Sequence, residues 1–322
     1  MYTVLPLVNH NDNLQEYASA ADLEHSYKQW GCDGLEIIQC GEDDNRIISK
    51  ESIIGFHIGF YSQWLDFWMG DEKRLLEEFG EKKVWEEFYG GANKETLIKY
   101  FKKELDKAQE LEARYVVFHV SEVTSRETLT YDYHYTNEEI IDQTIELVNG
   151  LLENSSYEFE FLMENLWWPG FTFTEPKLTK RLLEGIHYDK KGIMLDLGHL
   201  MHTKLELNSG QEACAYIREM LASHGELVKY IRGVHLHQSL TGGYVKEWMK
   251  QPLVIKEDFY ERFAQAYEHV FKIDKHQPML WEETKQLIQD IAPQYLVYEF
   301  YAKDRQQREA YLRKQAELFQ KG

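Results

Sequence analysis

Eight short apolar segments, separated by longer segments with helical periodicity, constrain the fold of this 322-residue chain more than any other feature. The apolar segments are TVLPLV, GLEII, GFHIGF, YVVFHV, FEFLMEN, GIMLDL, GVHLHQ and YLVYEF. Strands that are apolar throughout are typical of a parallel sheet covered on both faces by helices. Eight such units in succession favour a closed (β/α)8 TIM barrel over an open, doubly wound sheet. We therefore expect an α/β protein whose residues 1–322 form one barrel domain.

The segments between these strands carry the periodicity of amphipathic helices. From Asn93 to the strand YVVFHV, apolar residues recur at three- and four-residue spacing, which predicts a helix with one buried face. Thr136-Asn-Glu-Glu139 has the form of a capping box, so a helix is expected to begin there. Further helices are expected at 14–30, 176–184, 211–223, 257–270 and 304–320.

Two of the connections are too long for a simple barrel unit. One βα unit of a 250-residue barrel takes about 30 residues. Subtraction gives intervals of 62 residues from His57 to His119 and 64 from His235 to Glu299. Long insertions are therefore expected after strands 3 and 7, at the barrel end where active sites lie.

These insertions are rich in aromatic side chains. Because they leave the barrel at its catalytic end, we expect some of these side chains to contact substrate, together with a histidine that follows strand 7. The candidates for substrate contact are Trp64, Trp68, His237, Tyr244 and Trp248. The alternative is that the aromatic residues close a small satellite core.

Six of the apolar segments end in an acidic or imidazole side chain. These residues are His57, His119, Glu164, Asp196, His235 and Glu299. A single histidine on an apolar strand is usually a satisfied core residue, but a buried carboxylate costs several kcal/mol unless a cation or hydrogen-bond donors compensate it. The strands supply no basic partner beyond Arg114 and Arg232 at their beginnings. A divalent cation satisfies carboxylates and imidazoles together, so the pattern predicts a metal-dependent enzyme.

Composition narrows the possible partners. The chain has 36 basic and 55 acidic residues and a formal charge of −19, which repels nucleic acid in the absence of a basic groove. Its three cysteines form no C-x-x-C motif, and no leader or long apolar stretch is evident, so we expect a cytoplasmic protein without a membrane partner. A small molecule is the expected substrate. The G-x-S-x-G, G-x-x-x-x-G-K-[ST] and G-x-G-x-x-G motifs are absent.

Three motifs carry a family resemblance: Met163-Glu164-Asn165, Leu195-Asp196-Leu-Gly-His199 and Gly233-Val-His235-Leu-His237. With them, over nearly its whole length, the chain resembles the xylose isomerase-like TIM-barrel superfamily, which includes endonuclease IV and the tagatose and psicose epimerases. The epimerase branch implies one divalent metal held by Glu164, Asp196, His235 and Glu299.

The endonuclease branch implies a larger metal cluster. There, His57 and His119 share a second metal with Glu164, and His199 belongs to a third metal. An Asp-x-His pair is expected after the seventh strand in that branch, but residues 238–248 do not contain one. The resemblance therefore leaves the third metal without its full ligand set, with His237 and His202 as substitutes. It implies one to three ions per chain, with zinc or manganese expected.

Two reactions fit these residues. As a phosphoester hydrolase, the protein would use metals bridged by Glu164 to clamp the phosphate and activate water, with His199 as a further catalytic residue. As a ketose isomerase or epimerase, it would use Glu164 and Glu299 to move a proton on opposite sides of the substrate carbon. The seven metal-ligand candidates favour hydrolysis.

The acidic charge and the aromatic content narrow the substrate to a compact phosphodiester with a large apolar or planar body. Cobamide-remodelling phosphodiesterases, which belong to the same superfamily, supply the specific hypothesis by analogy. A sugar or inositol derivative is the second hypothesis, and a C-glycoside-cleaving lyase subunit is the third. A barrel that binds a small molecule without turnover is the non-enzymatic alternative. The sequence leaves the oligomeric state open.

Overall fold

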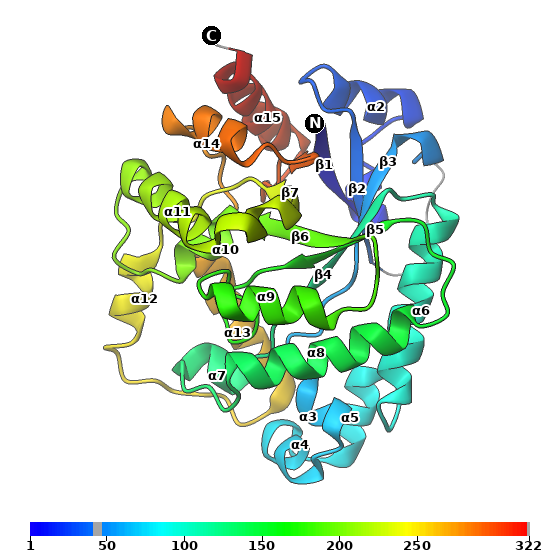
Figure 1. Ribbon diagram of the computed structural model, residues 1–322. Coiled ribbons are helices and arrows are strands. Elements are labelled where there is room, and N and C mark those ends of the chain that lie inside the picture. Colours follow the sequence, from blue (N-terminus) through cyan, green and yellow to red (C-terminus); the bar gives the residue numbers. More distant parts are fainter. Residues whose placement is uncertain (41–46, 321–322) are drawn as a thin grey trace.

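A closed barrel of eight parallel strands forms the centre of the computed structural model, which describes residues 1–40 and 47–320 (Figure 1). The strands are β1 Tyr2–Asn9, β2 Gly34–Gln39, β3 Ile53–His57, β4 Tyr115–His119, β5 Glu160–Glu164, β6 Lys191–Asp196, β7 Ile231–His235 and β8 Tyr295–Val297. Each strand pairs with its neighbours in sequence, and β8 pairs with β1, so the sheet has no free edge. The predicted fold class is confirmed.

Buried side chains form two main clusters, one inside the barrel and one between the strands and the helices. A small buried cluster on alternate strand positions fills the interior, and it includes Val4, Tyr115, Leu162 and Met194. A larger cluster packs between the strands and the helices. Glu36 is fully buried between Leu35 and Ile37, two members of the larger cluster, so its carboxylate points into the barrel. The barrel interior therefore contains the Glu36 carboxylate, out of contact with solvent.

An outer layer of helices surrounds the barrel. It comprises α2 Ala20–Lys28, α6 Glu95–Glu110, α8 Asn137–Leu152, α9 Pro176–Gly185, α11 Gly210–His224, α14 Glu283–Ile291 and α15 Arg305–Gln320. Short helices α1 Asn11–Leu14, α7 Ser125–Thr130 and α10 Leu197–His202 follow strand ends, and 3-10 turns lie at Lys50–Ser52 and Gly225–Tyr230. Within the described ranges, no helix is both long enough and apolar enough to cross a membrane.

The helix ends follow local capping chemistry. Thr136 and Glu139 form the expected capping box at the start of α8. The helix predicted at 14–30 was too long, because the Ser19 side chain accepts a hydrogen bond from the Asp22 backbone and starts α2 at Ala20. Asn11–Leu14 form the separate helix α1, and residues 15–19 connect the two helices.

Both predicted insertions are present, and they pack against each other. Helices α3 Leu65–Met69, α4 Glu72–Phe79 and α5 Lys82–Tyr89 follow β3, and helices α12 Gly242–Trp248 and α13 Phe259–Ile273 follow β7. Figure 1 shows α3, α4, α5 and α7 together at one end of the barrel. The Phe79 and Phe259 rings lie 4.3 Å apart, and the Phe88 and Phe263 rings 5.5 Å apart. The two insertions therefore share one apolar contact.

A buried ion pair supports this contact. The Arg262 guanidinium, on α13, lies 3.6 Å from the Glu78 carboxylate on α4 and donates to the Ser125 hydroxyl at 2.9 Å. It also donates to the Glu78 carbonyl. Both side chains are more than nine-tenths buried, so each charge depends on the other.

Replacing Arg262 by Met should therefore destabilise the protein by about 3–5 kcal/mol, since it leaves the Glu78 carboxylate buried without a cation. Denaturant unfolding monitored by tryptophan fluorescence measures the loss. The matched control is Arg181→Met, which removes an exposed pair with Asp142 and should change stability little. Equal effects of the two substitutions would show that the buried pair does not support the insertions.

Candidate metal centre

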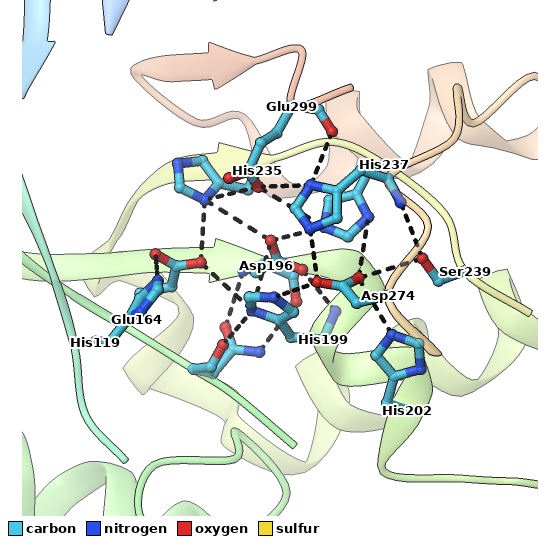
Figure 2. A network of polar contacts seen from close by, with 12 residues as sticks. His119, Glu164, Asp196, His199, His202, His235, His237, Ser239, Asp274 and Glu299 are labelled. Carbon is cyan, nitrogen blue, oxygen red and sulfur yellow. Dashed lines mark hydrogen bonds and ion pairs between the residues drawn. The ribbon is translucent and has the colours of Figure 1, made fainter. Parts of the chain in front are cut away.

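Five of the six strand-end residues are the last residues of their strands. They are His57 on β3, His119 on β4, Glu164 on β5, Asp196 on β6 and His235 on β7. Glu299 lies two residues beyond the end of β8. Because parallel strands end on the same rim of the barrel, the six side chains converge there, as Figure 2 shows for five of them.

Glu164 stands between two sets of imidazoles. Its Oε2 atom lies 3.3 Å from His57 Nε2 and 3.0 Å from His119 Nε2. Its Oε1 atom lies 3.1 Å from His235 Nδ1 and 3.4 Å from His199 Nδ1. The two oxygens of one carboxylate thus face two different ligand sets, which is the geometry of a bridging ligand.

A four-residue ligand set includes Glu164. One ligand atom from each of Glu164, Asp196, His235 and Glu299 lies within 4.8 Å of the others. Glu299 Oε2 is 3.2 Å from His235 Nδ1. Among the described residues, Glu164 Oε2 and Glu299 Oε2 are buried oxygens without a hydrogen-bond donor. These unsatisfied lone pairs fit a bound cation.

A third ligand set contains an Asp-x-His pair that the sequence interpretation missed. Asp274 Oδ2 lies 2.6 Å from His276 Nε2 and 3.2 Å from His199 Nε2. The pair Asp274-Lys275-His276 directly follows α13, so the insertion displaced it from the segment 238–248 in which it was expected. The expectation that the third set is incomplete was therefore wrong.

Several histidines are held in the orientation that metal binding requires. In each, Nδ1 lies near a backbone carbonyl and leaves Nε2 free to face the carboxylates: His57 with Ile58 at 3.1 Å, His199 with Asn165 at 2.9 Å, and His276 with Glu299 at 3.2 Å. An imidazole that donates from one nitrogen presents a lone pair on the other. These backbone carbonyls therefore favour metal-ligating tautomers.

The carboxylates of the three sets lack basic partners other than histidine. Among the described residues, the ion pairs of Glu164, Asp196, Asp274 and Glu299 are with imidazoles alone. Burial opposes the charge of Glu164, but His119 and His235 hold the pKa of its carboxyl group well below the usual value. Burial raises the pKa of Glu299, with His235 and His276 acting in the opposite direction. Divalent cations fit this acidic donor set.

Glu36 was not singled out as a site residue, yet it contacts the metal centre from inside the barrel. Its Oε2 atom lies 3.3 Å from His235 Nε2 and accepts a hydrogen bond from the Tyr115 hydroxyl at 2.8 Å. His235 Nδ1 faces Glu164 and Glu299, so Glu36 holds the opposite side of the same ring. A carboxylate in this place fixes the tautomer of a ligating imidazole and increases its basicity.

His237 belongs to the third ligand set, because one ligand atom from each of His199, His237, Asp274 and His276 lies within 4.8 Å of the others, and His202 lies beside this set. The His237 ring stacks on His276 with centroids 3.9 Å apart, and its Nε2 is 2.9 Å from Asp196 Oδ2. A Cβ atom on Gly198 would lie 1.9 Å from the His237 ring, so glycine is required there. His202 Nε2 lies 3.3 Å from Asp274 Oδ1. The fully buried His237 is thus placed to orient carboxylates, and its predicted contact with substrate is untested.

The aromatic residues predicted to contact substrate make contacts with other parts of the chain. Trp64 Nε1 donates to the Ser121 carbonyl, and the Lys94 ammonium lies over the Trp68 ring. Trp248 Nε1 donates to the Leu129 carbonyl, and Tyr244 bonds to His269. These contacts are those of the satellite-core alternative.

Other aromatic residues surround a cavity of 180 Å³ beside the ligand sets. Its walls include Phe60, Trp167, Trp168, Phe263 and Tyr267, while His119, His199, Asp274, His276 and Glu299 line its floor. Phe263 and Tyr267 come from α13, so the second insertion does supply aromatic side chains to this cavity. Sequence pattern alone did not distinguish them from Tyr244 and Trp248.

Comparison with known proteins agrees with this architecture. A family model described as xylose isomerase-like TIM barrel matches residues 27–321. Endonuclease IV from Thermus thermophilus has a TM-score of 0.53 and 11% identity, with 100% of both chains covered. D-psicose 3-epimerase with D-tagatose from Clostridium cellulolyticum has a TM-score of 0.50 and 9% identity, with 99% of this chain and 97% of that chain covered. No curated protein matches the sequence. At these identities, the structural likeness shows the fold alone.

The position of Glu36 predicts that it sets metal affinity. Glu36→Leu should weaken metal binding by about 10–100-fold, because His235 loses its orienting carboxylate. Tyr115→Phe, which removes one hydrogen bond and keeps the charge, should weaken binding less. Competition with a chromogenic chelator measures both, and thermal unfolding controls for folding. Wild-type affinity in a folded Glu36→Leu protein would contradict this role.

The third ligand set predicts a pH dependence of metal binding. Burial alone would lower the pKa of His276, but Asp274 and Glu299 raise it to about 9. A bound proton competes with a metal for the same nitrogen, so metal affinity should rise as the pH approaches about 9. Metal titrations across this range test the trend, and His276→Gln should flatten it. Affinity that falls with increasing pH would contradict the assignment.

Proposed function

The chain belongs to the xylose isomerase-like TIM barrel family, and we propose that it is a divalent-metal-dependent phosphoester hydrolase that acts on small phosphodiesters. The observation that carries the proposal is the presence of three adjoining ligand sets on one rim of the barrel. A reaction at a single metal needs only one of them. Hydrolysis of a phosphodiester at several metals uses all three.

Each set has its own residues in this proposal. Glu164 Oε2, His57 and His119 form the first, and Glu164 Oε1, Asp196, His235 and Glu299 form the second. His199, His237, Asp274 and His276 form the third. Bound zinc or manganese ions would supply Lewis-acid activation of water and neutralise charge on the phosphate. The role of Glu164 is to hold the first two sets at a fixed separation.

The cavity walls support an ester with little charge beyond its phosphate. Among the described residues, no Lys or Arg lines the 180 Å³ cavity. The ionisable groups that a phosphate would meet there belong to the ligand sets, while the indole and phenyl walls would keep bulk water away from it. The overall charge of −19 also disfavours a long nucleic acid as substrate.

The same cavity limits the cobamide hypothesis. An engineered cavity of about 150 Å³ holds one benzene molecule, so 180 Å³ cannot enclose a corrin macrocycle. A cobamide would have to place only the phosphate of its nucleotide loop at the metal centre, with the macrocycle outside. We therefore rank small aryl and alkyl phosphodiesters first, with cobamides as a second group to be assayed.

One observation favours an isomerase or epimerase instead. Glu164 and Glu299 lie in the same four-residue set, and burial raises the pKa of Glu299, as expected of a group that carries a proton. This alternative leaves Asp274 and His276 without a catalytic reason to be buried beside His199. For that reason it ranks second.

The proposal predicts metal-dependent turnover of a generic phosphodiester such as bis(p-nitrophenyl) phosphate. Chelation should abolish the activity, and zinc or manganese should restore it. Glu164→Gln should lower kcat by about 10²–10³-fold, the usual loss on removal of one preorganised charge-stabilising group. The matched control is Glu160→Gln, at the opposite end of the same strand β5, which should keep wild-type activity.

Metal content separates the proposal from its alternatives. Two or three ions per chain, with phosphodiester turnover, support hydrolysis. One ion per chain, with proton exchange at a ketose carbon and no hydrolysis, supports the epimerase. A metal-loaded protein that retains a ligand after Glu164→Gln and turns over neither substrate would be a binding barrel.

A further inference from the structure

A second hollow adjoins the metal cavity on the far side of Trp167 and Trp168. Its volume is 550 Å³, against 180 Å³ for the metal cavity. Both tryptophans line both spaces, so their indoles form the wall between them. We call the larger space the tryptophan groove. Its other walls come from α10, α11, α12 and the segments that flank α7 and β5.

None of the described residues that line the tryptophan groove is Asp, Glu, Lys or Arg, unlike most of the surface. Charged residues make up 28% of the chain, yet none is among the residues that line the groove. A neighbouring cleft of 620 Å³ has the opposite character, since Arg74, Arg126 and Glu127 are among its lining residues. Lys204 lies over the outer Tyr216 ring but pairs with Glu219. The groove is thus uncharged and aromatic within an acidic protein.

The groove also reaches the third ligand set. The Trp167 ring lies 5.1 Å from the ring of His199 and 4.8 Å from that of His202, and both histidines contact Asp274. Trp167 Nε1 is buried without a hydrogen-bond partner among the described residues. Trp167 therefore lies between the third ligand set and the groove, where its indole would contact both a molecule at the metals and a ring in the groove.

The two spaces differ in which part of a phosphodiester each can hold. A space of 180 Å³ holds a phosphate group with a small substituent, by comparison with about 150 Å³ for benzene. The larger half of a diester needs the 550 Å³ groove. A charged group there would lose hydration without gaining a partner, whereas a flat ring gains contact with indole and phenol faces.

We propose that the tryptophan groove is a substrate subsite that holds one ester half of the phosphodiester, and that this half is an uncharged aromatic ring system. The inference rests on the proposed function for the position of the phosphate. It also identifies Trp167 as a specificity-determining residue, because this indole contacts both the metal ligands and the ring in the groove.

Equilibrium binding to the metal-loaded protein tests the subsite without relying on turnover. The probes are methyl phosphate, 1-naphthyl phosphate and a carboxyphenyl phosphate, measured by calorimetry. Naphthyl phosphate should bind at least about tenfold more tightly than methyl phosphate, owing to ring stacking and apolar burial. Carboxyphenyl phosphate should show no such gain, since its carboxylate finds no partner in the groove.

Two substitutions, each of which fills one of the two spaces, show where the naphthyl ring of the probe binds. Thr174 lines only the groove and Ala266 only the metal cavity. Thr174→Trp should remove the naphthyl advantage and leave methyl phosphate binding unchanged, whereas Ala266→Phe should preserve the ratio between the two. Thr172→Trp, also in the groove, provides a second blocking variant if the first folds poorly. Metal content and thermal unfolding verify each protein.

Three results would overturn the subsite. They are equal affinity for naphthyl and methyl phosphate in the wild type, a naphthyl advantage that survives both groove substitutions, and loss of the advantage only in Ala266→Phe. Failure of the proposed function has a different signature. Naphthyl phosphate would then bind in the groove as expected, while the metal-loaded protein hydrolysed no phosphodiester.

Discussion

The need to neutralise buried acids on one rim of the barrel governs the rest of the structure. Glu164, Asp196, Asp274 and Glu299 converge there from separate parts of the chain, and Glu36 lies below them in the interior. Without cations, this density of negative charge in a low-dielectric setting would cost many kcal/mol. Seven histidines surround the acids, and backbone carbonyls fix several of their rings. The arrangement therefore has the ligand types and the geometry to hold cations.

The fold and part of this site could be predicted because all strands of a parallel barrel end on the same rim. An acid or imidazole at the end of an apolar strand falls on the catalytic rim, so His57, His119, Glu164, Asp196 and His235 were identifiable from sequence. Glu299 followed the same rule with an offset of two residues. Glu36 escaped notice because it lies in the middle of its strand, where no rim position marks it as functional.

The remaining site residues depend on tertiary packing. Asp274 and His276 follow a 15-residue helix within an insertion, and only the packing of α13 against α7 and α4 returns them to the rim. Likewise, aromatic content predicted an aromatic cavity but not its members. Trp64 and Trp248 donate hydrogen bonds to backbone carbonyls, whereas Trp167, Phe263 and Tyr267 line the cavity. Such choices depend on contacts between segments far apart in the sequence.

The position of Asp274 and His276 also gives a bound metal a topological role. An ion held by His199, Asp274 and His276 would join the end of the second insertion to α10, closing the chain loop from His199 to Asp274. A cross-link of this kind lowers the entropy of the open loop, as a disulfide does. Metal loss would therefore remove one of the constraints on α13, in addition to its contacts with the first insertion, so cofactor occupancy contributes to the order of the cavity wall that this helix carries.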